Sequence, residues 1–326
     1  MESYDVIVVG AGPAGYVCAI RAAQLGQKVA IMDKQWLGGV CLNVGCIPSK
    51  SLLKNAEVVH TLRERGKEFG FSFENLRLDY GVAVKRSRQV SDRLVKGIGF
   101  LMKKNNIAVH MGTAKVIAKD TVAVTDKDGK LTELKVRNVV VATGASAMVP
   151  AAWKVDGEKV VTYLEAITQE KLPKSVIIIG SGAIGVEFAT VWSSYGVDVT
   201  IVEMLSRLVP LEDEEVSAEL EKAFKKRGIQ ALAGHKVESV EATETGVKVT
   251  VSAKGETKVL EAEQALVAIG FRSNSKGLGL EEVGVKISER GFIEIDERMA
   301  TNIPGIWAIG DVTGKLMLAH VGSTMG

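Results

Sequence analysis

The sequence has few cysteines, no long apolar run and almost no net charge. Its 326 residues include three cysteines, Cys18, Cys41 and Cys46, and this low, odd number excludes the disulfide framework of a small secreted protein. No apolar run approaches the ~18–20 residues of a membrane helix. With 41 basic and 39 acidic residues, the net charge of +2 provides no electrostatic attraction to nucleic acid or an anionic membrane. We therefore expect neither nucleic acid nor a membrane as a partner.

Aromatic residues are also scarce, at 5%, whereas glycine is abundant, with 34 residues. This combination favours sites lined by backbone, where the chain approaches a ligand closely. The apolar share of 46% and charged share of 25% are typical of a soluble globular protein, and the length predicts two domains. The segment Met1–Asp5 lacks the basic stretch of a signal peptide, so we expect a cytoplasmic protein.

The chain contains one internal repeat. The segments 6–34 (VIVVGAGPAGYVCAIRAAQLGQKVAIMDK) and 176–204 (VIIIGSGAIGVEFATVWSSYGVDVTIVEM) align without a gap. Each has an apolar run, a G-x-G-x-x-G motif, a helical stretch, a second apolar run and an acid. Continuous short apolar runs indicate strands buried on both faces, which pair in parallel through the intervening helix. The repeat therefore predicts an α/β protein with two Rossmann-like dinucleotide-binding domains.

Hydrophobic periodicity and glycine positions predict further helices and strands. Gly26 and Gly196 stand where the two repeat helices end. The pattern predicts helices over Ser49–Arg65, Gly81–Asn105 and Val216–Lys226, and strands over Tyr4–Val9, Val29–Met32, Ala108–Val124, Leu131–Ala142, Val176–Ile179 and Val199–Val202. The segment Pro150–Asp156 is the expected crossing between the domains.

The first fingerprint consists of Gly10, Gly12 and Gly15. The first glycine makes a tight turn, the second lets the backbone approach a pyrophosphate, and the third lets helix and strand pack closely. The helix N-terminus then presents free N–H groups to the phosphates. Asp33 ends the second strand, where an acid accepts hydrogen bonds from a ribose diol.

The second fingerprint consists of Gly180, Gly182 and Gly185, with Glu203 at the position equivalent to Asp33. Two structural glycine turns are the alternative, but two copies that each carry an acid favour two nucleotide sites. Glu203 favours NAD over NADP, because a carboxylate repels a 2′-phosphate. Two dinucleotides in one chain indicate electron transfer between a nicotinamide nucleotide and a flavin dinucleotide.

Cys41 and Cys46 lie close together in the segment 38–50, GGVCLNVGCIPSK. Five residues on an ideal helix would not share a face, but an irregular turn could join them, and Gly45 permits unusual backbone angles. A metal site is one alternative, although two thiols do not fill a zinc shell. A buried, inert pair is another. Their position just before a helix lowers a thiol pKa and favours redox chemistry.

The cysteine segment resembles the active-site segment of the flavin disulfide reductases, and within that family it is most similar to the branch that oxidises dihydrolipoamide. The resemblance extends in chain order through GAGPAG, the cysteine segment, VVATGA at 140–145, GSGAIG and TNIPGIWAIGDVTG at 301–314. It implies bound FAD and a visiting NAD. Val40, Ala145, Phe271 and Ser273 depart from the usual family pattern, and none of these departures removes the redox pair.

The resemblance also implies roles for individual residues. Cys41 and Cys46 would form the redox disulfide, with Cys46 facing the flavin and Cys41 exchanging with the substrate. Lys50 would lie near the flavin and pair with Glu187, although an ordinary surface ion pair is the simpler interpretation of those two residues. The further cofactor-binding positions that it implies are Gly39, Lys50, Gly144, Gly270, Asp311, Leu318 and Ala319.

These inferences combine into one expected architecture. Residues 1–149 and 271–326 would form a discontinuous FAD-binding domain, and residues 150–270 an inserted NAD-binding domain. The family resemblance implies a third domain, which forms the homodimer interface and supplies a His–Glu acid–base pair, and we expect this chain to lack it.

The implied activity is transfer of electrons from dihydrolipoyl groups of a 2-oxoacid dehydrogenase-type complex through the cysteine pair and FAD to NAD+. The alternatives are a flavin disulfide reductase for glutathione-like or mercuric substrates, and an FAD- and NADH-binding fragment without dithiol turnover. No metal ion is expected.

Overall fold

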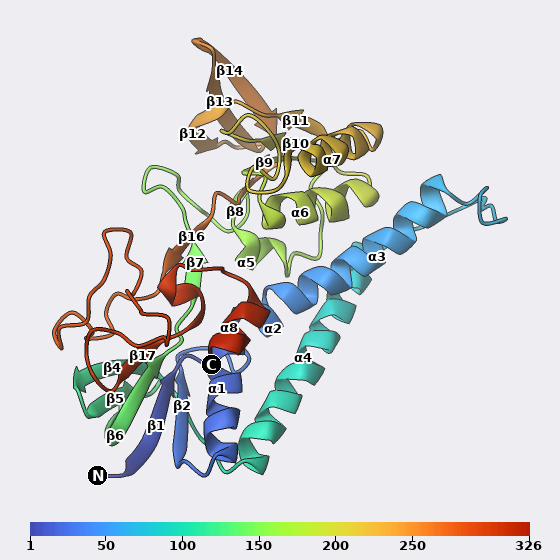
Figure 1. Ribbon diagram of the computed structural model, residues 1–326. Helices are drawn as coiled ribbons and strands as arrows, with labels where there is room; N and C mark the ends of the chain where they lie inside the picture. The colour runs from blue at the N-terminus through green and yellow to red at the C-terminus, as the bar shows by residue number, and fades with distance from the viewer. The chain divides into compact units, whose positions relative to one another are not determined.

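The computed structural model describes residues 1–326, and contacts divide the chain into two compact units (Figure 1). Unit 1 comprises Met1–Cys46, Ser91–Ser146 and Phe271–Gly326, and unit 2 comprises Ile47–Val90 and Ala147–Gly270. Each unit is built on a sheet with a parallel core that carries one copy of the repeat. The predicted α/β class with two Rossmann-like units is confirmed.

Unit 1 contains a seven-stranded sheet in the order β3-β2-β1-β6-β5-β4, with β17 paired to β6. Strands β3, β2, β1, β6 and β17 run parallel, whereas β5 and β4 join as an antiparallel hairpin. The bounds are β1 Ser3–Val9, β2 Val29–Asp33, β3 Ala108–Met111, β4 Thr113–Ala118, β5 Thr121–Thr125, β6 Leu131–Val141 and β17 Ile306–Ala308.

The register of this sheet explains why its central strands are apolar toward their carboxyl ends. Val8 of β1 lies between Ile31 of β2 and Val140 of β6, and all three are buried. A strand paired on both sides and covered on both faces has no position for a polar side chain. The carboxyl ends of the parallel strands therefore meet at one edge, where ligands bind in folds of this kind.

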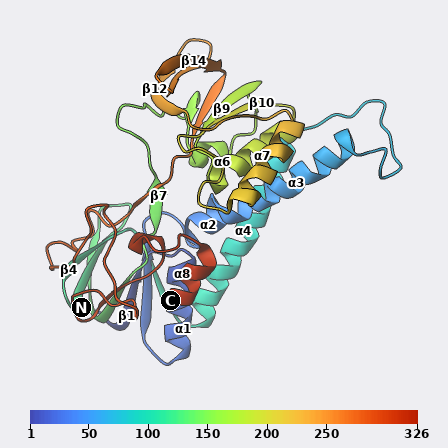
Figure 2. The same cartoon turned by 45° about the horizontal axis from the view of Figure 1, so that its top comes forward.

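The helices of unit 1 include α1 Pro13–Gln24, α2 Gly39–Asn43, the 3-10 helix η1 Gly310–Thr313 and α8 Ala319–Met325. Figures 1 and 2 both show α8 beside α1, and this contact is close because a Cβ on Gly322 would lie 3.2 Å from the Cβ of Ala14. Gly26, with φ of +83°, follows the end of α1 as predicted.

Unit 2 contains a five-stranded parallel sheet in the order β11-β10-β9-β15-β8. Its strands are β8 Val160–Val161, β9 Ser175–Ile179, β10 Asp198–Val202, β11 Gln230–Leu232 and β15 Gln264–Val267, and its helices include α5 Tyr163–Ala166, α6 Ala183–Ser194 and α7 Glu214–Lys226. An antiparallel meander, β12 Lys236–Ala242, β13 Val247–Ala253 and β14 Glu256–Ala262, packs its buried valines on this sheet. No sequence prediction covered the meander.

Two long helices cross from one unit to the other along the chain. They are α3 Cys46–Glu64 and α4 Tyr80–Lys104, close to the predicted 49–65 and 81–105. Unit 1 runs to Cys46, the first residue of α3, and resumes at Ser91 within α4, so nearly all of α3 and the first part of α4 belong to unit 2. Within unit 2, Arg86 Nη1 donates to Ser51 Oγ at 2.8 Å and joins the two helices. No helix is long and apolar enough to cross a membrane.

The chain also passes between the units through a two-stranded sheet, formed by β7 Ala145–Ala147 and β16 Phe271–Ser273. The contact-based boundaries fall at 146/147 and 270/271, whereas the sequence placed the first crossing at 149/150. Residues 47–90 also belong to unit 2, with 147–270, whereas the sequence analysis placed them in the first domain. The nucleotide that each unit binds stays a prediction.

Candidate functional site

The first fingerprint forms a tight turn at the carboxyl end of β1. Gly10 has φ of +109°, and a Cβ there would overlap the carbonyl oxygen of Ala142 at the end of β6. A Cβ on Gly15 would overlap the carbonyl oxygen of Gly10 and lie 3.3 Å from Val8 Cγ1. The first and third glycines are therefore required by close packing of backbone, as the motif predicts.

The N-terminus of α1 is open. Its N-cap, Gly12, provides no side-chain cap, and the nearest atom to a Cβ on Gly12 would be the Cα of Gly39, at 3.9 Å. Pro13 occupies the first helical position, which needs no N–H partner. Uncapped N–H groups and the positive end of the helix dipole fit the pyrophosphate of a dinucleotide.

The second fingerprint repeats this geometry in unit 2. Gly180 has φ of +101°, and a Cβ there would overlap the carbonyl oxygen of Ala268. A Cβ on Gly185 would overlap the carbonyl oxygen of Gly180 and lie 3.3 Å from Ile178 Cγ2. Around Gly182 no atom lies within 4 Å of an added Cβ, and no side chain caps α6. This open cradle likewise fits a pyrophosphate.

The acids after β2 and β10 bind the fingerprint turns. Asp33 Oδ2 accepts a hydrogen bond from Ala11 N at 2.8 Å, and Glu203 Oε2 accepts one from Ser181 N at 2.9 Å. Asp33 Oδ1 also accepts from two backbone N–H groups of the following loop, and Glu203 Oε1 accepts from Leu205 N at 2.8 Å. The sequence predicted only a ribose contact for these acids and missed their contacts with the turns.

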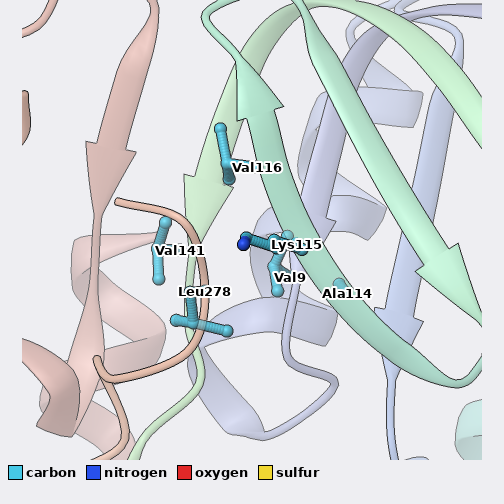
Figure 3. Close-up of a pocket in the computed structure, with 6 residues that line it drawn as sticks. All are labelled: Val9, Ala114, Lys115, Val116, Val141 and Leu278. Carbon is cyan, nitrogen blue, oxygen red and sulfur yellow. The ribbon is translucent and has the colours of Figure 1, made fainter. Parts of the chain in front are cut away.

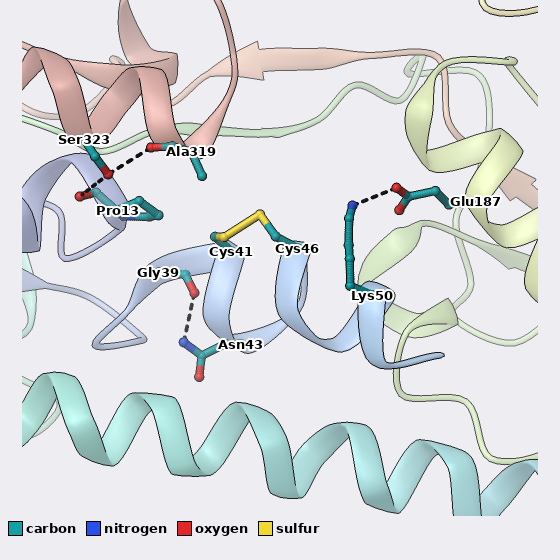
Figure 4. The surroundings of a disulfide bond; sticks show 9 residues. All are labelled: Pro13, Gly39, Cys41, Asn43, Cys46, Lys50, Glu187, Ala319 and Ser323. Carbon is teal, nitrogen blue, oxygen red and sulfur yellow. Dashed lines mark hydrogen bonds and ion pairs between the residues drawn. A yellow bond between two sulfur atoms is a disulfide. The ribbon is translucent and has the colours of Figure 1, made fainter. Parts of the chain in front are cut away.

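The cysteine segment docks on the first fingerprint. Gly38 N donates to Ala11 O at 2.9 Å, and a Cβ on Gly39 would overlap the Cα of Gly12. Both glycines have positive φ, +89° and +60°, which explains the Gly-Gly pair before the cysteines. Asn43 Nδ2 donates to Gly39 O at 2.8 Å and holds this turn closed (Figure 4). The motif is thereby fixed beside the open end of α1.

Cys41 and Cys46 form a disulfide, with Cα atoms 4.7 Å apart (Figure 4). Cys41 lies on α2 and Cys46 is the first residue of α3, so the helical path breaks at Val44 and Gly45. Gly45 has no positive φ, so the irregular turn does not use the left-handed conformation that glycine permits. A Cβ there would be tightly placed, 3.0 Å from Val40 O and 3.3 Å from Cys41 Cα.

Lys50 and Glu187 form an ion pair within unit 2, with Nζ and Oε1 2.7 Å apart (Figure 4). Lys50 lies one turn after Cys46 on α3, and Glu187 lies in the first half of α6. The Lys50 side chain is 62% exposed and that of Glu187 26%, so the pair contributes little to stability. Its catalytic role stays a prediction.

The remaining predicted residues of unit 1 lie around the open end of α1. Leu318 and Ala319 begin α8, whose Ser323 Oγ donates to Ala319 O at 3.0 Å (Figure 4). The Asp311 carboxylate in η1 makes no side-chain hydrogen bond, and its burial raises the pKa of this group. A half-buried carboxylate without a protein partner fits a ligand hydroxyl.

Gly144 lies between β6 and β7 in unit 1, and Gly270 lies between β15 and β16 in unit 2. Their φ angles are +69° and +122°, and no atom lies within 4 Å of an added Cβ at either position. Each therefore combines a conformation that favours glycine with open space. Asn274, to which the sequence analysis gave no site role, hydrogen-bonds to the residues around Gly144.

The pocket in Figure 3 lies elsewhere in unit 1. Apart from Lys115 its lining is apolar, and Lys115 Nζ pairs with Glu282 at 3.4 Å. The lining residues are Val9, Ala114, Lys115, Val116, Val141 and Leu278. It contains none of the polar groups that a nucleotide requires, and we assign it no site.

Comparison with known proteins identifies the family of this chain. The family described as pyridine nucleotide-disulphide oxidoreductase matches residues 4–326. The chain belongs to this family. Two curated relatives, the dihydrolipoyl dehydrogenases of Corynebacterium glutamicum and Mycobacterium leprae, are each 49% identical over the whole chain, which covers 69% and 70% of their lengths.

Solved structures of this family have the same fold. The crystal structure of LpdA from Mycobacterium tuberculosis aligns with a TM-score of 0.91 at 30% identity, over 100% of this chain and 71% of the other. The flavoprotein disulfide reductase RclA from Escherichia coli, in its Cu(II) complex, aligns with a TM-score of 0.87 at 27% identity, over 100% of this chain and 69% of the other. Family members use FAD and NAD(H), which agrees with the two open cradles.

Proposed function

We propose that this protein oxidises dihydrolipoyl groups, passing their electrons through the Cys41–Cys46 disulfide and a bound FAD to NAD+. The observation that carries this proposal is the disulfide itself, at the N-terminus of α3 and in a segment docked on the first fingerprint. The high identity to two dihydrolipoyl dehydrogenases supports the choice of substrate.

We assign FAD to unit 1. Its pyrophosphate would bind at the N-terminus of α1, where Gly12 has no side chain to obstruct a ligand and the N–H groups are uncapped. Asp33 would bind the adenosine ribose with its remaining lone pairs, and Asp311 would accept from a hydroxyl of the flavin side chain. FAD, when bound, supplies the two-electron acceptor that links the thiols to the nicotinamide.

We assign NAD to unit 2. Gly182 would adjoin the pyrophosphate at the N-terminus of α6, and Glu203 would accept from the ribose diol. Glu203 is buried with its carboxylate beside the turn, and a carboxylate there disfavours the 2′-phosphate of NADP. Gly270 would lie beside the same nucleotide.

The cysteines carry the thiol–disulfide exchange. A dihydrolipoyl thiolate attacks Cys41 Sγ, the Cys41–Cys46 bond breaks, and Cys46 leaves as a thiolate. The positive end of α3 stabilises that thiolate, because Cys46 is the first residue of the helix. The second dihydrolipoyl thiolate then attacks the lipoyl sulfur of the mixed disulfide, which forms the lipoyl disulfide and releases Cys41.

Lys50 would hold a positive charge near the thiolate that forms at Cys46, since it lies one turn further along α3. Glu187 would orient the Lys50 ammonium through their 2.7 Å ion pair. The lipoyl-bearing partner, assumed to belong to a 2-oxoacid dehydrogenase-type complex, the homodimer and the cytoplasmic location stay predictions.

An anaerobic titration with NADH tests the proposal. The purified protein, supplied with FAD, should be yellow, and NADH should raise a long-wavelength absorption band that Cys46→Ser abolishes. Dihydrolipoamide should reduce the wild-type protein, whereas reduced glutathione should not. A protein that stays colourless after FAD is added, or that reacts with glutathione in preference to dihydrolipoamide, would contradict the proposal.

A further inference from the structure

The chain re-enters unit 1 through a short polar segment, Ser273–Ser275, whose three side chains bind three different parts of that unit. Ser273 Oγ donates to Val312 O at 3.2 Å, next to Asp311. Ser275 Oγ donates to Gly291 O at 2.6 Å and is buried. Asn274, between them, binds the turn that carries Gly144.

Asn274 is the most extensively bonded of the three. Its Nδ2 donates to Thr143 O at 3.0 Å, and its Oδ1 accepts from Ser146 Oγ at 2.8 Å. Its backbone takes part as well, because Asn274 N donates to Gly144 O at 3.1 Å and Thr143 Oγ1 donates to Asn274 O at 2.9 Å. Four polar groups of the turn 143–146 therefore form hydrogen bonds with one residue.

This turn requires external support. Gly144 has φ of +69°, and no atom lies within 4 Å of an added Cβ, so no neighbouring side chain packs against Gly144 on that side. A glycine in such open space has many accessible backbone conformations, and hydrogen bonds to a neighbouring strand remove them before a ligand binds.

We infer that Asn274 is a positioning residue for FAD, which orders the Gly144 turn and, with Ser273, fixes its spacing from the Asp311 turn. The inference rests on the proposed assignment of FAD to unit 1. Asn274 itself would touch no reacting atom, and it acts through backbone groups that line the open space. Ser273 contributes because its hydroxyl donates to Val312 O, next to Asp311.

The test compares Asn274→Ala with Asn302→Ala in the full chain. Asn302 is a matched control in unit 1, since its amide also makes two side-chain hydrogen bonds, to Gly284 O and from Lys286 N, both at 2.8 Å. Asn274→Ala should raise the Kd for FAD by about tenfold and shift the reduction potential of the bound flavin. Asn302→Ala should change the FAD Kd by less than about twofold, because its contacts lie far from either turn in sequence.

A second variant keeps the inference testable if Asn274→Ala misfolds. Asn274→Asp keeps the acceptor for Ser146 but places an oxygen against Thr143 O, so it should also weaken FAD binding, and circular dichroism at the titration temperature shows that the apoprotein is folded. Equal FAD Kd and flavin potential in the Asn274 and Asn302 variants would overturn the inference. A wild-type protein that binds no FAD would instead overturn the proposed function on which the inference rests.

Discussion

The carboxylate of Glu203 accepts hydrogen bonds from both the backbone nitrogen and the hydroxyl of Ser181, at 2.9 and 2.7 Å. In unit 1 the equivalent pair, Asp33 and Ala11, has only the backbone bond. Ser181→Ala therefore converts the second turn to the form of the first. It should lower the free energy of unfolding by about 1.5 kcal/mol, the usual contribution of a hydrogen bond to a charged group, in a urea titration.

The coenzyme preference depends on the carboxylate rather than on this hydroxyl. Glu203→Ala should raise the NADPH-to-NADH ratio of kcat/KM, because the repulsion of a 2′-phosphate is lost. Ser181→Ala should leave that ratio unchanged, since the carboxylate remains. Equal ratios in all three proteins would show that Glu203 does not face the coenzyme.

Two glycines of the second fingerprint should differ sharply. Gly182 has φ of −68° and open space around an added Cβ, so Gly182→Ala should fold normally and raise the Kd for NADH at least about tenfold by blocking the pyrophosphate. Gly185→Ala would place a Cβ against Gly180 O and should cost about 3 kcal/mol of stability. Circular dichroism melting and NADH fluorescence titration separate the two effects.

The Lys50–Glu187 pair should matter for catalysis and not for folding. Glu187→Gln should change the free energy of unfolding by less than about 1 kcal/mol, because the pair is exposed, and should slow flavin reduction by dihydrolipoamide about tenfold. The exposed pair Lys54–Glu57, at 2.9 Å on the same helix, provides the control. Glu57→Gln should leave both quantities unaltered, and stopped-flow absorbance measures the rate.

Serine variants of the two cysteines should differ in their absorption spectra. Cys41→Ser leaves Cys46 at the N-terminus of α3, where its thiolate is stabilised, so the long-wavelength band should be present before any reductant is added. Cys46→Ser should show no such band at any pH. Identical spectra for the two variants would contradict the assignment of Cys46 to the flavin side.

Burial of Asp311 should make the apoprotein less stable as the pH rises. Its pKa is raised above 3.8 in the folded state, so the folded protein binds the proton more tightly than the unfolded chain. Stability is then greatest below the unfolded pKa and decreases until the pH exceeds the folded one. Asp311→Asn should stabilise the apoprotein at pH 7, lose that advantage near pH 4 and weaken FAD binding, as urea titrations at each pH would show.

Much of the fold and the site follows from the sequence, because strands buried on both faces and glycines forced by close backbone contacts leave few alternatives. Strands β1 and β9 and both fingerprint turns lie where the repeat predicts. The inward contacts of Asp33 and Glu203 were not foreseen, since the motif relates those acids only to the ribose. Nor could helical periodicity assign residues 47–90 to a unit, because an apolar face does not specify which neighbour covers it.

The order of the segments has a consequence for synthesis of the chain on the ribosome. Unit 2 needs nothing beyond Gly270, whereas unit 1 lacks β17 and α8 until residues 306–325 have emerged. Domains generally fold as units in the order of synthesis. Here unit 1, which contains the first strand, is completed last. Part of the core beside β1 and β6 therefore stays exposed, because β17 and α8 have not emerged, while unit 2 can already fold.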